Sequence, residues 1–116
     1  MVPEFQTIML PLLENLKGGE EFDFEQSCNV LAEYLRVEDE DLKILLPGSA
    51  QTLFHSNLRQ AKSHLIMSGL IENTTRGLFK ITSLGKQVLN KRPNFIDTNY
   101  LKRFPGYTEA VNRLPE

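Results

Sequence analysis

The sequence lacks the features of a secreted or membrane-spanning protein. Cys28 is the only cysteine among the 116 residues, which excludes an internal disulfide framework and favours a reducing compartment. No apolar run approaches the roughly 20 residues needed to span a bilayer, and the N-terminus has no signal-peptide pattern. We therefore expect a cytoplasmic protein that has no membrane partner.

Residue patterns that carry catalysis or hold a cofactor are also missing. The sequence contains no phosphate-binding glycine loop and no nucleophile elbow. His55 and His64 lie nine residues apart on one predicted helix, so they cannot share a metal ion at helical ligand spacing. The four consecutive acids at 38–41 would fan around a helix instead of converging on a metal ion. We expect no enzyme activity in this chain, no catalytic residues, no metal site and no cofactor.

What the chain does contain is an uneven distribution of charge. The formal net charge is -2, yet residues 1–49 carry three Lys or Arg against eleven Asp or Glu. Residues 50–92 carry seven Lys or Arg against Glu72 alone. A basic middle third in an otherwise acidic chain is typical of a surface that faces a polyanion. The alternative is a solvated basic face that has no partner.

Apolar spacing and capping signals predict two helices in the acidic N-terminal part. Apolar residues recur at helical intervals over 5–16, where Pro11 should bend the helix or confine its regular part to either side of the proline. Asp23 is placed to cap a second helix, and Gln26 is placed to complete a capping box. The second helix should run to about Arg36.

A long helix is predicted over 52–68, and its two faces differ in chemistry. The face predicted to be buried carries Phe54, Leu58, Ala61 and Leu65 at helical spacing. The opposite face carries Ser56, Arg59, Gln60, Ser63 and Met67, and the flanks carry Asn57 and Lys62. Arginine suits guanine, glutamine and asparagine suit adenine, and serine can bond to bases or phosphates. Because the exposed face contains no acid, we interpret it as a DNA-recognition surface; an ordinary solvent face is the alternative.

A β-hairpin is predicted directly after the long helix. Short strand-like runs at 70–71 and 78–81 flank a polar turn, in which Gly77 can take a positive φ. Thr75 and Arg76 would lie at the tip of this turn, where the wing of a winged helix exposes a cation to DNA. A plain hairpin with an incidental arginine is the alternative.

The returning strand leads into a further basic helix. Lys80 lies on this strand, with Phe79 and Ile81 expected on its inner face. Ser83 is expected to cap the helix that follows, on which Lys86 should be exposed.

The order of a helix, a hairpin and a helix is that of a winged helix-turn-helix. The predicted fold class is therefore mainly α with a small β-hairpin. The expected partner is double-stranded DNA, with the recognition helix 52–68 in the major groove and the wing 72–82 on the backbone or in the minor groove. The residues expected to bind DNA are Ser56, Asn57, Arg59, Gln60, Lys62, Ser63, Thr75, Arg76, Lys80 and Lys86.

Several short motifs carry a resemblance to a known family through their order and spacing. They are Leu46-Pro47-Gly48, Ser68-Gly69-Leu70-Ile71-Glu72, Arg76-Gly77, and Phe79-Lys80-Ile81-Thr82 with Gly85. The chain resembles the N-terminal domain of Mrr restriction-system proteins over nearly its whole length. The resemblance implies a DNA-binding winged helix that a linker joins to a separate C-terminal endonuclease domain. It also implies action on modified, typically methylated, foreign DNA. The chain departs from the family pattern at Gln60, where a tryptophan is usual.

These elements define the expected domain organisation. We expect one winged-helix domain over 1–116, with a core at about 4–92 and a helical extension at 93–116, as the N-terminal part of a longer protein. The further expected partners are a C-terminal endonuclease domain and, as one option, a second copy in a homodimer. The alternative function is a protein-interaction or dimerisation domain, or a transcription regulator. Ile66 and Met67, apolar residues on the helix surface, favour a protein partner.

Overall fold

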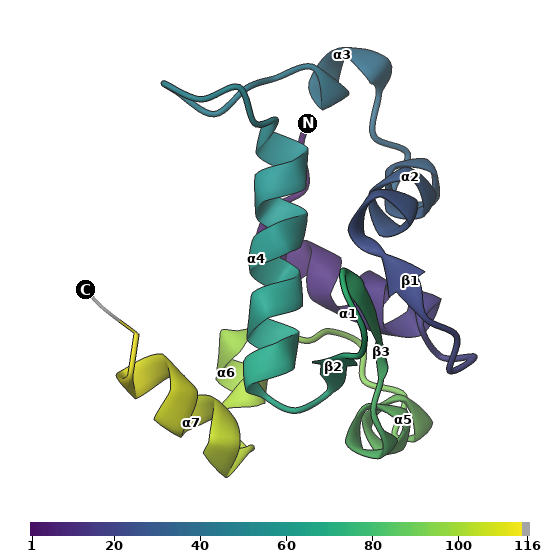
Figure 1. The fold of residues 1–116 in the computed structure, drawn as a ribbon, viewed down its shortest axis with the longest axis vertical. Helices are drawn as coiled ribbons and strands as arrows, with labels where there is room; N and C mark the ends of the chain where they lie inside the picture. The colour runs from purple at the N-terminus through teal and green to yellow at the C-terminus, as the bar shows by residue number, and fades with distance from the viewer. Residues whose placement is uncertain (115–116) are drawn as a thin grey trace.

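The computed structural model describes residues 1–114 as a mostly helical protein with one small antiparallel sheet (Figure 1). The elements in chain order are α1 (Phe5–Asn15), β1 (Phe22–Asp23), α2 (Phe24–Tyr34), α3 (Asp39–Leu42), α4 (Leu53–Met67), β2 (Ile71–Asn73), β3 (Leu78–Ile81), α5 (Ser83–Asn90), α6 (Thr98–Leu101) and α7 (Pro105–Asn112). The predicted fold class, mainly helical with a small β-hairpin in a winged-helix arrangement, is confirmed.

The strands follow the order β1-β3-β2, and both pairings are antiparallel. The hairpin predicted after the long helix is confirmed, with Ile71 opposite Ile81. Phe79 and Ile81 are buried, as the alternation along the strand predicts. The sequence does not predict β1, because a strand of two residues has no period to read. β1 forms through the distant pairing of Phe22 with Phe79.

Local hydrogen bonds set the ends of the two N-terminal helices. α1 runs through Pro11 without a break, which excludes the expectation that proline confines the regular helix to either side of it. The capping box of α2 is confirmed, since Gln26 N donates to Asp23 Oδ1 at 2.7 Å and Asp23 N donates to Gln26 Oε1 at 3.2 Å. α2 ends at Tyr34, earlier than predicted, because Arg36 adopts a left-handed φ of 55°.

α4 lies at the centre of the fold and packs against α1, which crosses behind it (Figure 1). Its bounds agree with the predicted helix, and the side chain of its N-cap Thr52 accepts a hydrogen bond from His55 N. The apolar positions predicted to face inward are all fully buried: Phe54, Leu58, Ala61 and Leu65. Their burial fixes the rotation of the helix, so the acid-free opposite face is turned outward.

Thr82, and not Ser83, caps α5. Thr82 Oγ1 accepts a hydrogen bond from Gly85 N at 3.1 Å and donates to Gly69 O at 2.6 Å. The prediction of Ser83 is wrong by one residue, because the Thr82 hydroxyl lies between the start of α5 and the turn that follows α4. One side chain thereby caps α5 and ties it to the turn that follows α4.

The C-terminal extension packs back on α1 and α4. Ile96 and Leu101 are fully buried, and Tyr107 is nearly so. Thr98 donates from its backbone N and its hydroxyl to Gln6 Oε1, at 3.0 Å and 3.2 Å. The extension forms two helices, since α6 ends at Leu101 and α7 starts at Pro105. Residues 93–114 therefore complete the core, and the remainder of the predicted extension lies outside the described residues.

Candidate nucleic-acid interface

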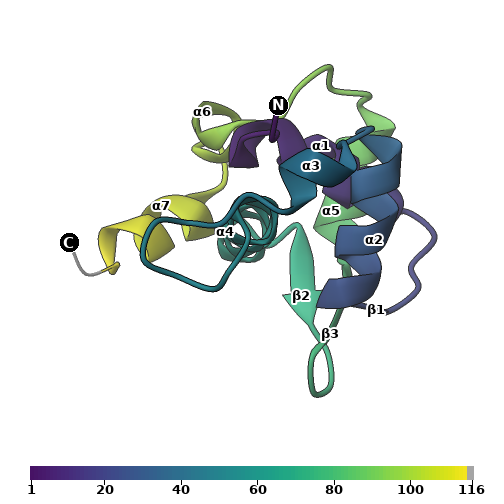
Figure 2. The ribbon, with the colours of Figure 1, turned by 90° about the horizontal axis from the view of Figure 1, so that it is seen from above.

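The exposed face of α4 lies between two neighbouring elements, α7 on one side and the β2–β3 hairpin on the other (Figure 1). Seen from above, along the axis of α4, the turn of the hairpin projects well beyond the helix (Figure 2). The exposed helix face and the projecting turn are on the same side of the molecule. A long helix beside a protruding hairpin is the arrangement with which winged helices meet DNA.

The outward face of α4 presents polar and cationic side chains. Arg59, Gln60 and Ser63 are exposed, and Ser56 is partly exposed. The guanidinium carbon of Arg59 lies 4.2 Å from the centroid of the Phe24 ring, so this side chain packs against α2 through a cation–π contact. α4 contains no Asp or Glu. These four predicted residues therefore share one surface that is free of negative charge from its own helix.

Two predicted residues on the flanks of α4 contact other parts of the protein. Lys62 Nζ lies 4.6 Å from the centroid of the Phe79 ring, and partial burial, followed by the nearby charge of Arg59, lowers the Lys62 pKa. Asn57 Nδ2 donates a hydrogen bond to Pro3 O at 2.9 Å. Lys62 thus lies towards the hairpin, whereas Asn57 is held towards the N-terminal segment, on the flank away from the hairpin.

The projecting turn carries the two residues predicted to lie at the tip of the wing. Thr75 and Arg76 are both exposed. Gly77 has a φ of 75°, which confirms the positive φ predicted at this position. Thr74 N donates to Leu78 O at 2.9 Å, and Leu78 N donates to Thr75 O at 2.8 Å, so the backbone closes the turn. The Arg76 cation is consequently displayed at the outermost point of the hairpin.

Lys80 and Lys86 gather at the base of the hairpin, where both line a shallow hollow with Glu72. Lys80 Nζ lies 4.0 Å from Glu72 Oε1 across the β2–β3 ladder. Glu72 therefore offsets part of the Lys80 charge, while Lys86 remains exposed on α5. Apart from Asn57, which is held on the far flank of α4, the predicted residues thus fall into three groups: the face of α4 with Lys62 at its hairpin edge, the tip of the hairpin and its base.

Sequence reasoning missed a partly buried aromatic contact beside the helix face. His64 Nδ1 lies 2.9 Å from the Tyr107 hydroxyl, and the Phe5 ring stacks on His64 with centroids 5.0 Å apart. Burial lowers the His64 pKa from its ordinary value and raises the Tyr107 pKa. The three residues join α1, α4 and α7, so they position α7 against the flank of α4.

We predict that His64 makes the fold less stable in mild acid. Because the His64 pKa is lowered below 6.5 on folding, the unfolded chain takes up a proton there before the folded chain does. The contribution of neutral His64 to folding stability is therefore fully present above about pH 6.5, and it falls as the pH drops towards the pKa of His64 in the folded chain. Urea unfolding at about pH 7.5 and about pH 5 should show a smaller loss for His64→Gln than for the original chain. An equal loss in both proteins would contradict a role for His64.

Metal and thiol chemistry find no support in the described part of the chain. Within residues 1–114, no group of three or more His, Cys, Asp or Glu side chains is placed to hold a metal ion. Cys28 is buried, and burial raises the pKa of its thiol to about 12. Over the same residues, every helix is too short or too polar to cross a membrane.

A comparison with protein families agrees with this arrangement. The family model of the Mrr N-terminal domain matches residues 5–91. The chain belongs to the Mrr N-terminal domain family. The match runs from the start of α1 through α5, so it includes the α4 face and the whole hairpin. No curated protein and no solved structure matches the chain.

Membership in the Mrr N-terminal domain family associates this chain with restriction systems. The Mrr N-terminal domain is not itself a nuclease. α6 and α7 lie beyond the matched residues, although their side chains complete the core of this Mrr N-terminal domain.

Proposed function

We propose that this domain binds double-stranded DNA on behalf of a restriction system directed at modified foreign DNA. In this proposal α4 enters the major groove, and the β2–β3 hairpin acts as the wing on the backbone or in the minor groove. The observation that carries the proposal is the acid-free outward face of α4, which lies beside a projecting hairpin with a cation at its tip (Figure 2).

The side chains on the three groups differ in the contact that each can make. Arg59 has the bidentate donor geometry that suits guanine, and Gln60 has the donor and acceptor pair that suits adenine. Lys62, Lys80 and Lys86 carry cations suited to phosphates, which position a protein without reading sequence. The Glu72 partner of Lys80 makes that lysine the weakest of the three.

We predict that binding to a labelled duplex weakens steeply with salt, since each phosphate contact releases condensed counterions. Fluorescence anisotropy should show a loss of roughly tenfold or more in affinity between about 50 mM and about 200 mM salt.

Arg59→Ala should weaken binding by about 1–3 kcal/mol and reduce the preference for one base at the position that Arg59 contacts. Arg76→Ala should weaken binding to all sequences alike and reduce the salt slope by about 1.

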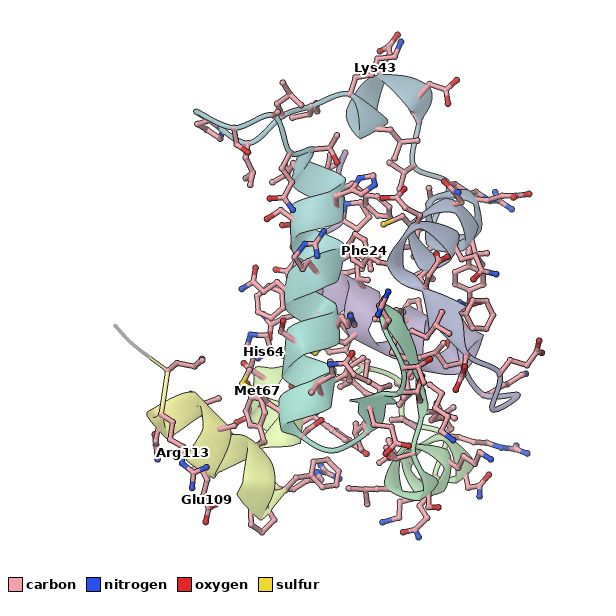
Figure 3. The ribbon with its side chains drawn as sticks, in the orientation of Figure 1. Phe24, Lys43, His64, Met67, Glu109 and Arg113 are labelled. Carbon is pink, nitrogen blue, oxygen red and sulfur yellow. The ribbon has the colours of Figure 1, made fainter. Side chains whose placement is uncertain are left out.

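The matched control for these arginines is Arg113→Ala. Arg113 is exposed on α7 and pairs with Glu109 at 3.7 Å, and Figure 3 shows both side chains on the side of α7 that faces away from α4. This variant should bind as the original chain does. Two results would exclude DNA binding. One is no binding at low salt, and the other is binding that changes neither with salt nor with the substitutions of Arg59 and Arg76.

A protein-interaction or dimerisation domain is the second candidate function. The loop between α3 and α4 exposes two large apolar side chains, Ile44 at 43% and Leu45 at 53%. Exposed apolar groups of this kind are typical of protein contacts. Light scattering on the purified chain tests this candidate: a dimer that Leu45→Ser converts to monomers would favour it, and a monomer at all concentrations would exclude dimerisation.

A further inference from the structure

A shallow hollow lies on the outward face of α4, in the C-terminal half of the helix. We define the methyl hollow by the residues that line it: Gln60, Ser63, His64, Ile66, Met67 and Leu114. Three of the six side chains are apolar, and Leu114 reaches the hollow from the end of α7. Figure 3 places Met67 and His64 on this part of α4, next to α7. The hollow therefore interrupts an otherwise polar surface with an apolar one.

The position of the hollow on α4 indicates which chemical group of a bound DNA could occupy it. Gln60, Ser63 and Met67 lie three and four residues apart and so share one face of the helix. This face is the one that Arg59 also borders and that enters the major groove in the proposed complex. The thymine C5-methyl is the apolar group that standard base pairs present in the major groove. Polar phosphates and sugars would gain nothing from Ile66 and Met67.

We propose that the methyl hollow receives the C5-methyl group of a thymine, so that this domain favours DNA with an A·T pair at one position. The proposal rests on the DNA binding proposed above. Met67 and Leu114 supply apolar contact with the methyl group, and the Ser63 hydroxyl lies beside them to bond the base edge. Gln60 lies about two helical turns before Met67, so in this complex it would contact a different base pair from the one at the methyl hollow, where it suits adenine.

The experiment removes the methyl group from the DNA without changing base pairing. A randomised duplex library is enriched on the purified chain, and each thymine of the tightest duplex is then replaced singly by deoxyuridine. We expect one replacement to weaken binding by roughly fourfold, as the loss of one buried methyl group requires. The remaining replacements should have little effect. If every thymine can be replaced without loss, the proposal is overturned.

A protein variant tests whether Met67 is the residue that reads the methyl group. Met67→Gln keeps the length of the side chain and removes its apolar end, and it should bind the thymine and deoxyuridine duplexes equally. Val111→Gln is the control, since Val111 is an exposed apolar residue on α7 that does not line the hollow. This control should retain the preference for thymine. A Met67→Gln protein that still prefers thymine would overturn the assignment.

Two further outcomes separate this inference from the proposed function. If the library yields no bound duplex, DNA binding itself fails and the inference fails with it. If duplexes bind with a salt dependence but ignore the thymine methyl, only the inference fails. A duplex that carries 5-methylcytosine and guanine at the sensitive position supplies the same methyl group from another base. Tighter binding to that duplex than to the thymine duplex would overturn the assignment of thymine.

Discussion

Replacing Gly85 by alanine is expected to destabilise the domain by about 3 kcal/mol. Gly85 is buried in α5, where alanine would ordinarily stabilise a helix by up to about 1 kcal/mol. Here the added Cβ would overlap the carbonyl oxygen of Leu70 and lie 2.6 Å from Ile81 Cγ1. The Leu70 carbonyl oxygen also accepts a hydrogen bond from Thr82 N at 3.0 Å. Steric overlap therefore outweighs helix propensity, because neither the strand nor the helix can move alone.

Gly106→Ala is the matched control for this substitution. Gly106 also lies in a helix, α7, but the nearest atom to its added Cβ would be Met67 O at an ordinary 3.8 Å. Alanine at this position should be neutral or stabilising by up to about 1 kcal/mol. Urea unfolding should show a lower midpoint for Gly85→Ala and an unchanged or higher midpoint for Gly106→Ala. Equal midpoints for the two variants would show that α5 does not approach the Leu70 carbonyl as closely as described.

Removing the C-terminal extension is expected to be the most damaging change. A chain that ends at Arg92 retains every residue of the family match, yet it loses the buried side chains of Ile96, Leu101 and Tyr107. Each fully buried side chain of this size contributes about 1.5–3 kcal/mol. Their combined loss approaches the total stability of a typical domain, about 5–15 kcal/mol. Circular dichroism should show the shortened chain largely unfolded, or melting far below the intact chain.

A single substitution in the intact chain distinguishes packing from chain length. Leu101→Ala keeps α6 and α7 but leaves a cavity, which should lower stability by about 2–5 kcal/mol. Its melting temperature is expected between those of the shortened and intact chains. If the shortened chain melted like the intact one, the burial of the extension would make no contribution and α7 would not be a fixed neighbour of α4.

Most of the fold was predictable because its signals are local. The spacing of Phe54, Leu58 and Leu65 reports the buried face of α4 wherever that helix packs. The capping box at Asp23 and Gln26 depends on residues three apart, so the sequence alone predicts it. β1 escaped prediction because its two residues acquire strand geometry only from β3, which follows much later in the chain.

The placement of the candidate interface depended on distant contacts. The sequence places Asn57 on a flank of the long helix, but only the structure shows that it donates to the Pro3 carbonyl, away from the hairpin. Lys80 reads as a free cation until strand register places Glu72 opposite it. The sequence shows His64 only as a residue of the long helix, whereas the structure places it in contact with Tyr107 and Phe5. Such contacts leave no trace in spacing or composition.

The sequence by itself determined the helices, the hairpin, the basic middle third and the outward chemistry of α4, since periodicity, capping and charge are properties of neighbouring residues. Only the tertiary structure decided which predicted residues share a surface and that α7 borders it. It also decided that Leu114 joins Met67 in one apolar hollow. The physical reason is that these relations arise from burial and hydrogen bonding between segments that are far apart in the chain.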